Sequence, residues 1–485
     1  MAMCAVSALA AGFLAADSRC FHWFVLPLAG CGVLVAVNAV EWLRGRVDLF
    51  DPGAVFGLYG VHFFLVAPLL HVVWDQWRPW VAGPQDWRTW LGWMALLNFA
   101  GLVAYNCARR LAARTSRSEP PRVSWRLNRT VFGRLLVLAL VGAAVLQLKV
   151  YASFGGLTGY ISAVSEAGKD FGLSNAFTGF GPVFMISESF PLVAWLGLLA
   201  YGRESRWLRA RTGAASCLAA VFVLLMLFGG LRGSRAATVW SLFLIAGSYH
   251  CWVQPIPKRI LVCGLAFLIA FMYLYGFYKA AGLDAIARFQ PPWDRRGLER
   301  ETGRSTGTMI LGDLARSDVQ ALILYRLTAP ESDFEPAWGR TYLGAASILV
   351  PRFLWPNKPD GKVRWTTEVE MGKQAYRAGR WISSMVAGLA GEAMLNFGLW
   401  AAPAAYALFG LFVGWTQRFA RTLDAHDSRR LLLPLLLTLA IQIPVSDLDN
   451  VIFFLMKYGA VPVLVVVLSS RRVVWEESQP LVHLR

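Results

Sequence analysis

Long apolar runs separated by short polar segments restrict what this chain can fold into. Each run has about 17 to 25 residues, enough for a helix to cross roughly 30 Å of hydrocarbon. Of the 485 residues, 56% are hydrophobic and 16% are charged, so a soluble domain of this length would lack polar surface. Because an α-helix satisfies its own backbone hydrogen bonds, it is the element expected in lipid. The sequence therefore predicts an all-α polytopic membrane protein.

We expect about twelve transmembrane helices. The first run lacks the basic segment that begins a signal peptide, so we interpret it as a span. In chain order the expected spans are residues 1–16, 21–42, 53–74, 89–107, 131–153, 183–202, 214–230, 236–252, 260–281, 398–416, 430–446 and 451–469.

Basic residues gather in every second connection between these spans. They include Arg44 and Arg46, Arg109 to Arg129, Arg203 to Arg211, Lys258 and Arg259, Arg418 to Arg429, and Arg471 and Arg472. The positive-inside rule explains this alternation, and with it the net charge of +17, if both termini are cytoplasmic. We therefore expect a multi-pass membrane protein with the bilayer as a partner and no nucleic-acid partner.

The connection at residues 282–397 is much longer than the others and lies on the external side in this topology. It divides the chain into helices 1–9 (residues 1–281), a large structured external loop (282–397), and helices 10–12 with a tail (398–485). Within the loop, residues 308–327 have helical spacing of apolar residues and predict an amphipathic helix along the membrane or over a cavity. We find no paired internal repeat of the kind that builds many transporters.

The short stretch LRGSR places two arginines, Arg232 and Arg235, on the external side against the positive-inside bias. Gly229, Gly230 and Gly233 let the backbone turn tightly and approach a ligand closely. Two guanidinium groups beside exposed backbone N–H groups suit a diphosphate. The alternative is that both arginines snorkel to lipid head groups.

A second cluster, PRFLWPNKP, lies in the large loop. Its prolines stiffen a segment that carries Arg352 and Lys358, which are candidates to bind substrate. Trp355 offers a flat face for a sugar. The alternative is an interfacial anchor followed by a turn.

A third cluster places Glu392 and Asn396 one turn apart on a helix that enters the membrane. A partly desolvated carboxylate has a raised pKa that suits a general base, although it could equally pair with an arginine. Other unusual charges in or beside the spans are Glu188, Lys457 and the pair Asp447 and Asp449. Such groups are functional candidates, but structural pairing of Lys457 with one of the aspartates is an open alternative.

Several familiar motifs are missing from the sequence. It contains no Walker loop, dinucleotide fingerprint, zinc-type histidine and glutamate spacing or nucleophile elbow. None of the seven cysteines lies in the large loop, and their spacing suggests neither a metal site nor a disulfide framework. The six histidines also avoid that loop, which excludes a histidine acid there.

The order of these motifs resembles the Wzy-type polymerases of oligosaccharide repeat units. The shared pattern is the external arginines after a glycine pair, a Gly-x-Thr-Tyr (Gly339–Tyr342), PRFLWPNKP, and GEAMLNFG leading into a late span. The resemblance covers roughly residues 214–416, and PRFLWPNKP and GE-x4-FG are its most specific parts.

The resemblance implies a bacterial inner-membrane glycosyltransferase that acts at the periplasmic face. Such enzymes transfer a growing glycan from undecaprenyl diphosphate to a fresh lipid-linked repeat unit, with no cofactor, metal or nucleotide sugar. Arg232 and Arg235 would hold the leaving diphosphate. Arg352 and Lys358 would close over it or hold the diphosphate of the acceptor. Glu392, or else Glu188, would accept the proton of the attacking hydroxyl. A chain-length regulator is an implied partner, and kinship with the GT-C fold is an analogy.

Two other functions remain open at this stage. An O-antigen ligase-like transferase would use a similar donor with a different acceptor, but such ligases typically use a histidine in the large loop. A flippase or other transporter of lipid-linked oligosaccharide would do no chemistry, and is expected to show repeated halves and short external loops.

Overall fold

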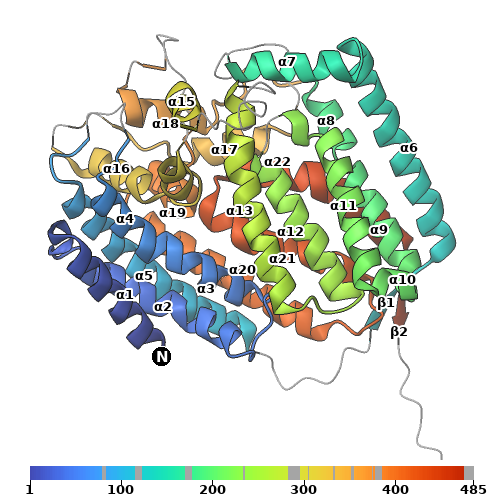
Figure 1. The fold of residues 1–485 in the computed structure, drawn as a ribbon, viewed down its shortest axis with the longest axis horizontal. Coiled ribbons are helices and arrows are strands. Elements are labelled where there is room, and N and C mark those ends of the chain that lie inside the picture. The colour runs from blue at the N-terminus through green and yellow to red at the C-terminus, as the bar shows by residue number, and fades with distance from the viewer. Residues whose placement is uncertain are drawn as a thin grey trace, which may run out of the picture. The chain divides into compact units, whose positions relative to one another are not determined.

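The structure is a computed structural model of the full chain. It describes residues 1–78, 83–114, 123–169, 177, 179–232, 235–281, 295–303, 305–330, 332, 334–350, 354–373, 375–376 and 385–474. Most of these residues, 77%, lie in helices (Figure 1), as the hydropathy predicts.

Each of the twelve expected spans coincides with a helix or a run of helices. Among the described residues, eight of these are long and apolar enough to cross a membrane, which supports the membrane-embedded class and leaves the count of twelve as a prediction. They are Val25–Leu43, Pro52–Trp74, Trp87–Ala113, Arg129–Ser153, Gly181–Gly202, Lys258–Tyr278, Ser428–Val445 and Leu448–Ser469.

The chain divides into two compact units, each built from segments far apart in sequence. Unit 1 comprises Met1–Ala113, Ala266–Gln417 and Leu437–Leu455. Its elements are α1 (Ala2–Ala16), η1 (Ser18–Cys20), α2 (Val25–Leu43), α3 (Pro52–Val61), η2 (His62–Val66), α4 (Ala67–Trp74), α5 (Trp87–Ala113), most of α13 (Lys258–Ala281), α15 (Arg295–Thr302), η4 (Thr308–Asp313), α16 (Ser317–Thr328), α17 (Arg340–Ser347), α18 (Lys362–Met371), α19 (Gly388–Phe397), most of α20 (Ala401–Thr422), the later part of α21 (Leu433–Val445) and α22 (Leu448–Phe454).

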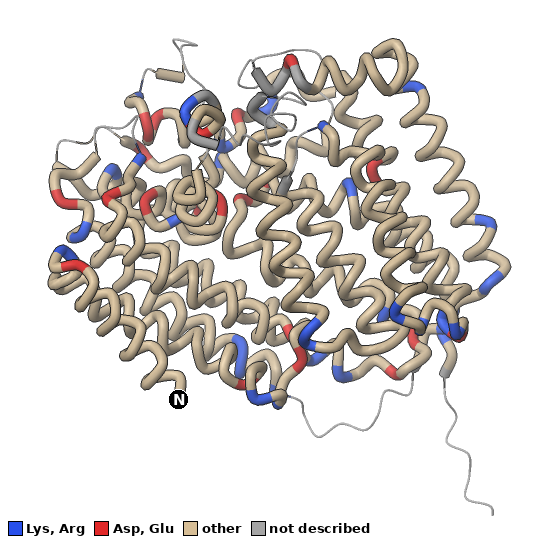
Figure 2. The backbone as a smooth tube through the Cα atoms, in the orientation of Figure 1, with Lys and Arg blue, Asp and Glu red and all other residues tan. Residues whose placement is uncertain are grey.

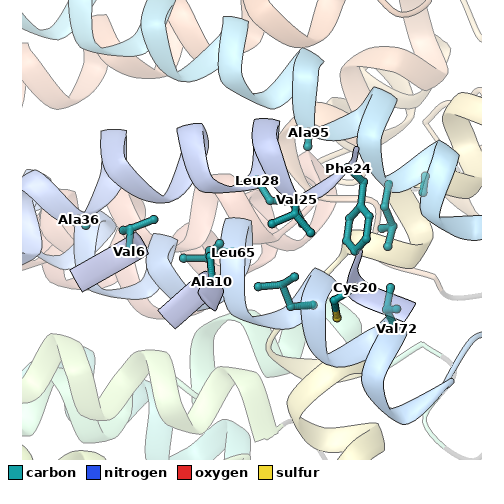
Figure 3. Close-up of a cluster of buried hydrophobic side chains, with 13 residues drawn as sticks. Val6, Ala10, Cys20, Phe24, Val25, Leu28, Ala36, Leu65, Val72 and Ala95 are labelled. Atoms are coloured by element: carbon teal, nitrogen blue, oxygen red, sulfur yellow. The ribbon is translucent and has the colours of Figure 1, made fainter. Parts of the chain in front are cut away.

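The core of unit 1 is apolar and formed by helices that approach closely. Phe24, Leu65 and Val72 belong to a buried cluster to which α1, α2, α4, α5 and α16 contribute (Figure 3). Helix α3 begins after Asp51, whose carboxylate accepts the N–H groups of Gly53 and Ala54. Small residues then let α3 pack against α2, as is common between membrane helices.

Unit 2 comprises Arg114–Leu265, Arg418–Leu436 and Met456–Arg485. Its elements are β1 (Val123–Leu127), α6 (Arg129–Ser153), α7 (Leu157–Lys169), α8 (Gly181–Ser187), α9 (Phe190–Gly202), α10 (Arg206–Arg209), α11 (Arg211–Leu227), η3 (Gly230–Arg232), α12 (Arg235–Trp252), the start of α13, η5 (Ser428–Leu431), the start of α21, most of η6 (Leu455–Ala460), α23 (Val461–Ser469) and β2 (Ser470–Val474).

A short antiparallel sheet in unit 2 was not expected from the sequence. Strand β1 pairs with β2, with Trp125 opposite Arg472. Basic residues gather around these strands (Figure 2), as the charge alternation predicts. The sheet joins segments more than 340 residues apart, and such a pairing has no local signal in the sequence.

The amphipathic helix predicted at residues 308–327 is interrupted. A π-helical turn, η4, ends at Asp313, and α16 begins at Ser317. Residues 317–324 are all buried, so α16 is not a surface helix. It packs against α5 and α19.

Candidate functional site

Six residues of unit 1 form a buried polar cluster, which we call the acidic cluster. Its members come from α17, α18, α19 and the start of α22 (Figure 1). They are Thr341, Lys362, Glu392, Asn396, Asp447 and Asp449.

Both carboxylate oxygens of Glu392 are hydrogen-bonded by neutral donors. The Thr341 hydroxyl donates to Oε1 at 3.0 Å, and the backbone N–H of Leu448 donates to Oε2 at 2.7 Å. Asn396 supports this arrangement, because its amide Nδ2 donates to the Thr341 hydroxyl at 2.6 Å and to the Glu392 carbonyl at 2.8 Å. Glu392 is therefore held in one orientation without a direct cation partner.

Asp447 and Glu392 cap each other's helices. Asp447 Oδ1 accepts the N–H groups of Ala387 and Gly388 at 2.9 and 2.8 Å, where α19 begins. Glu392, on α19, accepts the first N–H of α22, which immediately follows Asp447. Helix N-termini leave such N–H groups without partners inside the helix, so the two carboxylates lock α19 to α22.

Lys362 supplies the positive charge of the acidic cluster. Its Nζ lies 2.5 Å from Asp447 Oδ2 and 3.4 Å from Asp449 Oδ1. Although burial lowers the pKa of Lys362, the carboxylates of Asp447 and Asp449 outweigh that effect and raise it. Lys362 thus stays charged, and the cluster has three carboxyl groups for one ammonium.

Burial, together with this excess of carboxyl groups over cations, shifts the pKa of Glu392. Helix α19 lies outside the eight candidate spans. Burial, and next the charge of Asp447, raise the pKa of Glu392 to about 8, against the hydrogen bonds from Leu448 and Thr341 that lower it. A carboxyl group with a pKa near neutrality can both accept and release a proton under physiological conditions.

Four residues of unit 2 form a second buried cluster, which we call the cationic cluster. Glu188 is 2% exposed and lies at the break between α8 and α9. Arg232 Nη2 lies 2.5 Å from Glu188 Oε1, and Lys457 Nζ lies 3.0 Å from Oε2. The Tyr458 hydroxyl also donates to Oε2, at 3.4 Å. Lys457 and Tyr458 lie on the π-helical turn η6, a feature that is frequent at functional sites.

The cationic cluster holds Arg232 firmly. Its guanidinium lies 3.7 Å from the ring centroid of Phe184, a cation–π contact. A methyl group at Gly229 would lie 2.7 Å from the carboxyl carbon of Glu188, so this backbone passes closer than any larger residue allows. With two cations for one carboxylate, and with further N–H donors on Arg232, the cluster suits an anion.

The structure groups the predicted site residues into these two clusters. Glu392 and Asn396 belong to the acidic cluster; Arg232, Glu188 and Lys457 belong to the cationic cluster. The partner suggested for Lys457 was Asp447 or Asp449. Its partner is Glu188 instead, and both aspartates pair with Lys362.

The remaining predicted residues are not brought to either cluster by a described contact. Lys358 donates to the carbonyls of Ser347 and Val350 at 3.4 and 3.5 Å, at the end of α17, which is the contact of a helix cap. Trp355 is exposed. Arg352 and the side chain of Arg235 lie outside the described residues.

Sequence reasoning missed the roles of Thr341 and Lys362. Thr341 belongs to the Gly-x-Thr-Tyr element, so that motif was the available signal. Nothing in the sequence near Lys362 distinguishes it from other lysines. Its pairing depends on α18 lying beside the start of α22, which only the tertiary structure reveals.

Within the described part of the chain, no group of three or more His, Cys, Asp or Glu side chains is placed to hold a metal ion. Comparison with family models, with curated proteins and with solved structures found no match. The chain is therefore defined as a helical, membrane-embedded protein with two buried charged clusters.

Proposed function

We propose that this protein is a membrane glycosyltransferase of the Wzy type, located in a bacterial inner membrane and active at its periplasmic face. It would transfer a growing glycan from undecaprenyl diphosphate to a lipid-linked repeat unit. The order of motifs supports this class. The acidic cluster supports a catalytic function rather than a function that only binds the glycan.

The observation that carries the proposal is the environment of Glu392. A general base must be unprotonated for part of the time and must be held toward its substrate. Glu392 has a pKa of about 8 and is oriented by Thr341 and Leu448. Glu188 suits this task less, because two cations occupy its oxygens.

In the proposed reaction a sugar hydroxyl of the acceptor attacks the anomeric carbon of the donor glycan. The new glycosidic C–O bond forms as the bond from the anomeric carbon to the diphosphate oxygen breaks. Glu392 accepts the hydroxyl proton and later releases it to water. The resemblance assigns to Arg232, which shares the Glu188 carboxylate with Lys457, the role of stabilising the negative charge of the leaving lipid diphosphate.

A second candidate function is transport of the lipid-linked glycan. The acidic cluster favours it to some degree, because buried carboxyl groups that exchange protons also serve proton-coupled transporters. An O-antigen ligase-like transfer would use a similar donor with a different acceptor, but such ligases typically use a histidine in the large loop, and residues 282–397 contain none.

Reconstitution separates these functions. The purified protein in liposomes would receive undecaprenyl diphosphate-linked repeat units, and the products would be resolved on a gel. We expect a ladder with repeat-unit spacing that Glu392→Gln, which keeps the shape of the side chain, reduces by at least about 100-fold. Glu166→Gln, at an exposed glutamate on α7, is the matched control and should leave the ladder unchanged.

Each other outcome has a distinct meaning. Transfer of the glycan only to an acceptor without a lipid diphosphate identifies a ligase. Movement of the lipid between leaflets without product identifies a transporter. A normal ladder from Glu392→Gln rejects Glu392 as the base.

A further inference from the structure

A polar pocket lies beside the acidic cluster within unit 1. It encloses about 440 Å³, counting the open space at its mouth. Its lining comprises Phe334, Glu335, Pro336, Arg340, Arg364, Trp365, Glu368 and Lys373. All of these residues belong to the large loop.

The pocket and the acidic cluster share two helices. Arg340, in the pocket, directly precedes Thr341, which donates to Glu392. Helix α18 contributes Lys362 to the acidic cluster and its next turns to the pocket. A ligand in the pocket would therefore be held by the same elements that orient Glu392.

Ion pairs hold most of the charged groups of the pocket in place. Lys373 Nζ lies 2.8 Å from Glu335 Oε1, and Arg364 Nε lies 3.1 Å from Glu368 Oε1. The Arg340 side chain is exposed and has no hydrogen-bond or ion-pair partner among the described residues. The guanidinium of Arg340 is thus available to bind a ligand.

The two carboxylates determine which anion suits that guanidinium. Against the three cations Arg340, Arg364 and Lys373 they leave the lining a net charge of about +1, which one ligand carboxylate balances and the several negative charges of a diphosphate exceed. A sugar ring instead offers hydroxyl groups that donate to carboxylates. Phe334, Pro336 and Trp365 supply apolar walls for the C–H faces of such a ring.

We infer that this pocket binds a sugar residue that carries one carboxylate group, as a subsite for the glycan beside Glu392. Arg340 recognises the sugar carboxylate through paired N–H donors, and Glu335 and Glu368 accept the ring hydroxyls. The inference rests on the proposed function, and adds that the repeat unit contains an acidic sugar.

Saturation-transfer NMR on the purified full-length protein in nanodiscs tests the inference without requiring catalysis. The probes are methyl β-glucuronide, the neutral methyl β-glucoside and inorganic pyrophosphate. We expect the glucuronide to bind at least about tenfold more tightly than the glucoside. Arg340→Ala should lower affinity for the glucuronide about tenfold and leave the glucoside unchanged.

Two further variants sharpen the result. Arg300→Ala, at an exposed arginine of the same loop outside the pocket, should leave binding unchanged. Glu335→Gln should weaken both sugars, since it replaces one charged acceptor oxygen with an NH₂ donor and leaves only a neutral carbonyl acceptor. If the pocket held phosphate groups, Glu335→Gln would strengthen pyrophosphate binding instead.

The inference is overturned by an absence of glucuronide signal at about 10 mM, by tighter binding of pyrophosphate, or by equal losses in Arg340→Ala and Arg300→Ala. The gel ladder remains an independent measurement. A ladder without glucuronide binding would remove only the subsite, whereas binding without a ladder or transfer would remove only the proposed polymerase.

Discussion

The acidic and cationic clusters each bury a glutamate but place it among opposite charges. Glu392 accepts hydrogen bonds from a hydroxyl and an N–H, with two further carboxylates nearby. Glu188 lies between a guanidinium and an ammonium. The first arrangement makes it easier for a carboxyl group to hold a proton, and the second fixes two cations beside one carboxylate. The same residue type thus suits proton transfer in one unit and anion binding in the other.

Removing the carboxylate of Glu188 should have the largest effect on stability. In Glu188→Ala, the partly buried Arg232 and Lys457 would lose their carboxylate partner, at a cost of up to about 3–5 kcal/mol. Thermal unfolding of the purified protein in detergent measures this loss. Glu166→Ala is the matched control, and an equal Tm for the two variants would show that Glu188 does not hold the cationic cluster together.

Removing the guanidinium of Arg232 should mainly affect chemistry. If Arg232 stabilises the leaving diphosphate, Arg232→Ala should lower the rate of chain growth by about 10²–10³-fold. Arg232→Lys should restore little, because an ammonium cannot bind two oxygens with parallel N–H groups. A ladder of normal length and rate from Arg232→Ala would reject this role.

The pH dependence of stability should reveal the raised pKa of Glu392. An unfolded glutamate ionises near 4.5, whereas folded Glu392 keeps its proton up to about pH 8. Stability that is complete below pH 4.5 should therefore fall by about 1.4 kcal/mol per unit as pH rises toward 8. Glu392→Gln should remove this contribution, as measured by Tm at several pH values, and an unchanged slope would contradict it.

The smallest effect should come from the Thr341 hydroxyl. Thr341→Val removes one hydrogen bond to the Glu392 carboxylate, worth about 0.5–1.5 kcal/mol, so the pKa of Glu392 should rise by up to about one unit. The rising limb of the rate of chain growth against pH should then move to higher pH. Thr341→Ser keeps the hydroxyl and should retain the original midpoint. Equal losses at every pH in both variants would indicate a purely structural role.

Much of the fold could be predicted from the sequence, and particular residues show which features could not. The runs now seen as α2, α6 and α23 were found because hydrophobicity and backbone desolvation are local properties. Glu392 and Glu188 were identified because a charge among apolar neighbours is conspicuous. The helix expected at residues 308–327 is interrupted between Asp313 and Ser317, a break that its apolar spacing does not signal.

The ion-pair partners of the buried charged residues could not be predicted from the local sequence. Lys457 is close in sequence to Asp447, yet it pairs with Glu188, 269 residues away. Lys362 meets Asp447 across 85 residues. By itself, the sequence determined the helical membrane class and marked some of the buried charges, such as Glu392 and Glu188, because both follow from composition along a short segment. Only the tertiary structure decided which charge neutralises which, because ion pairing depends on distances of a few ångströms between distant segments.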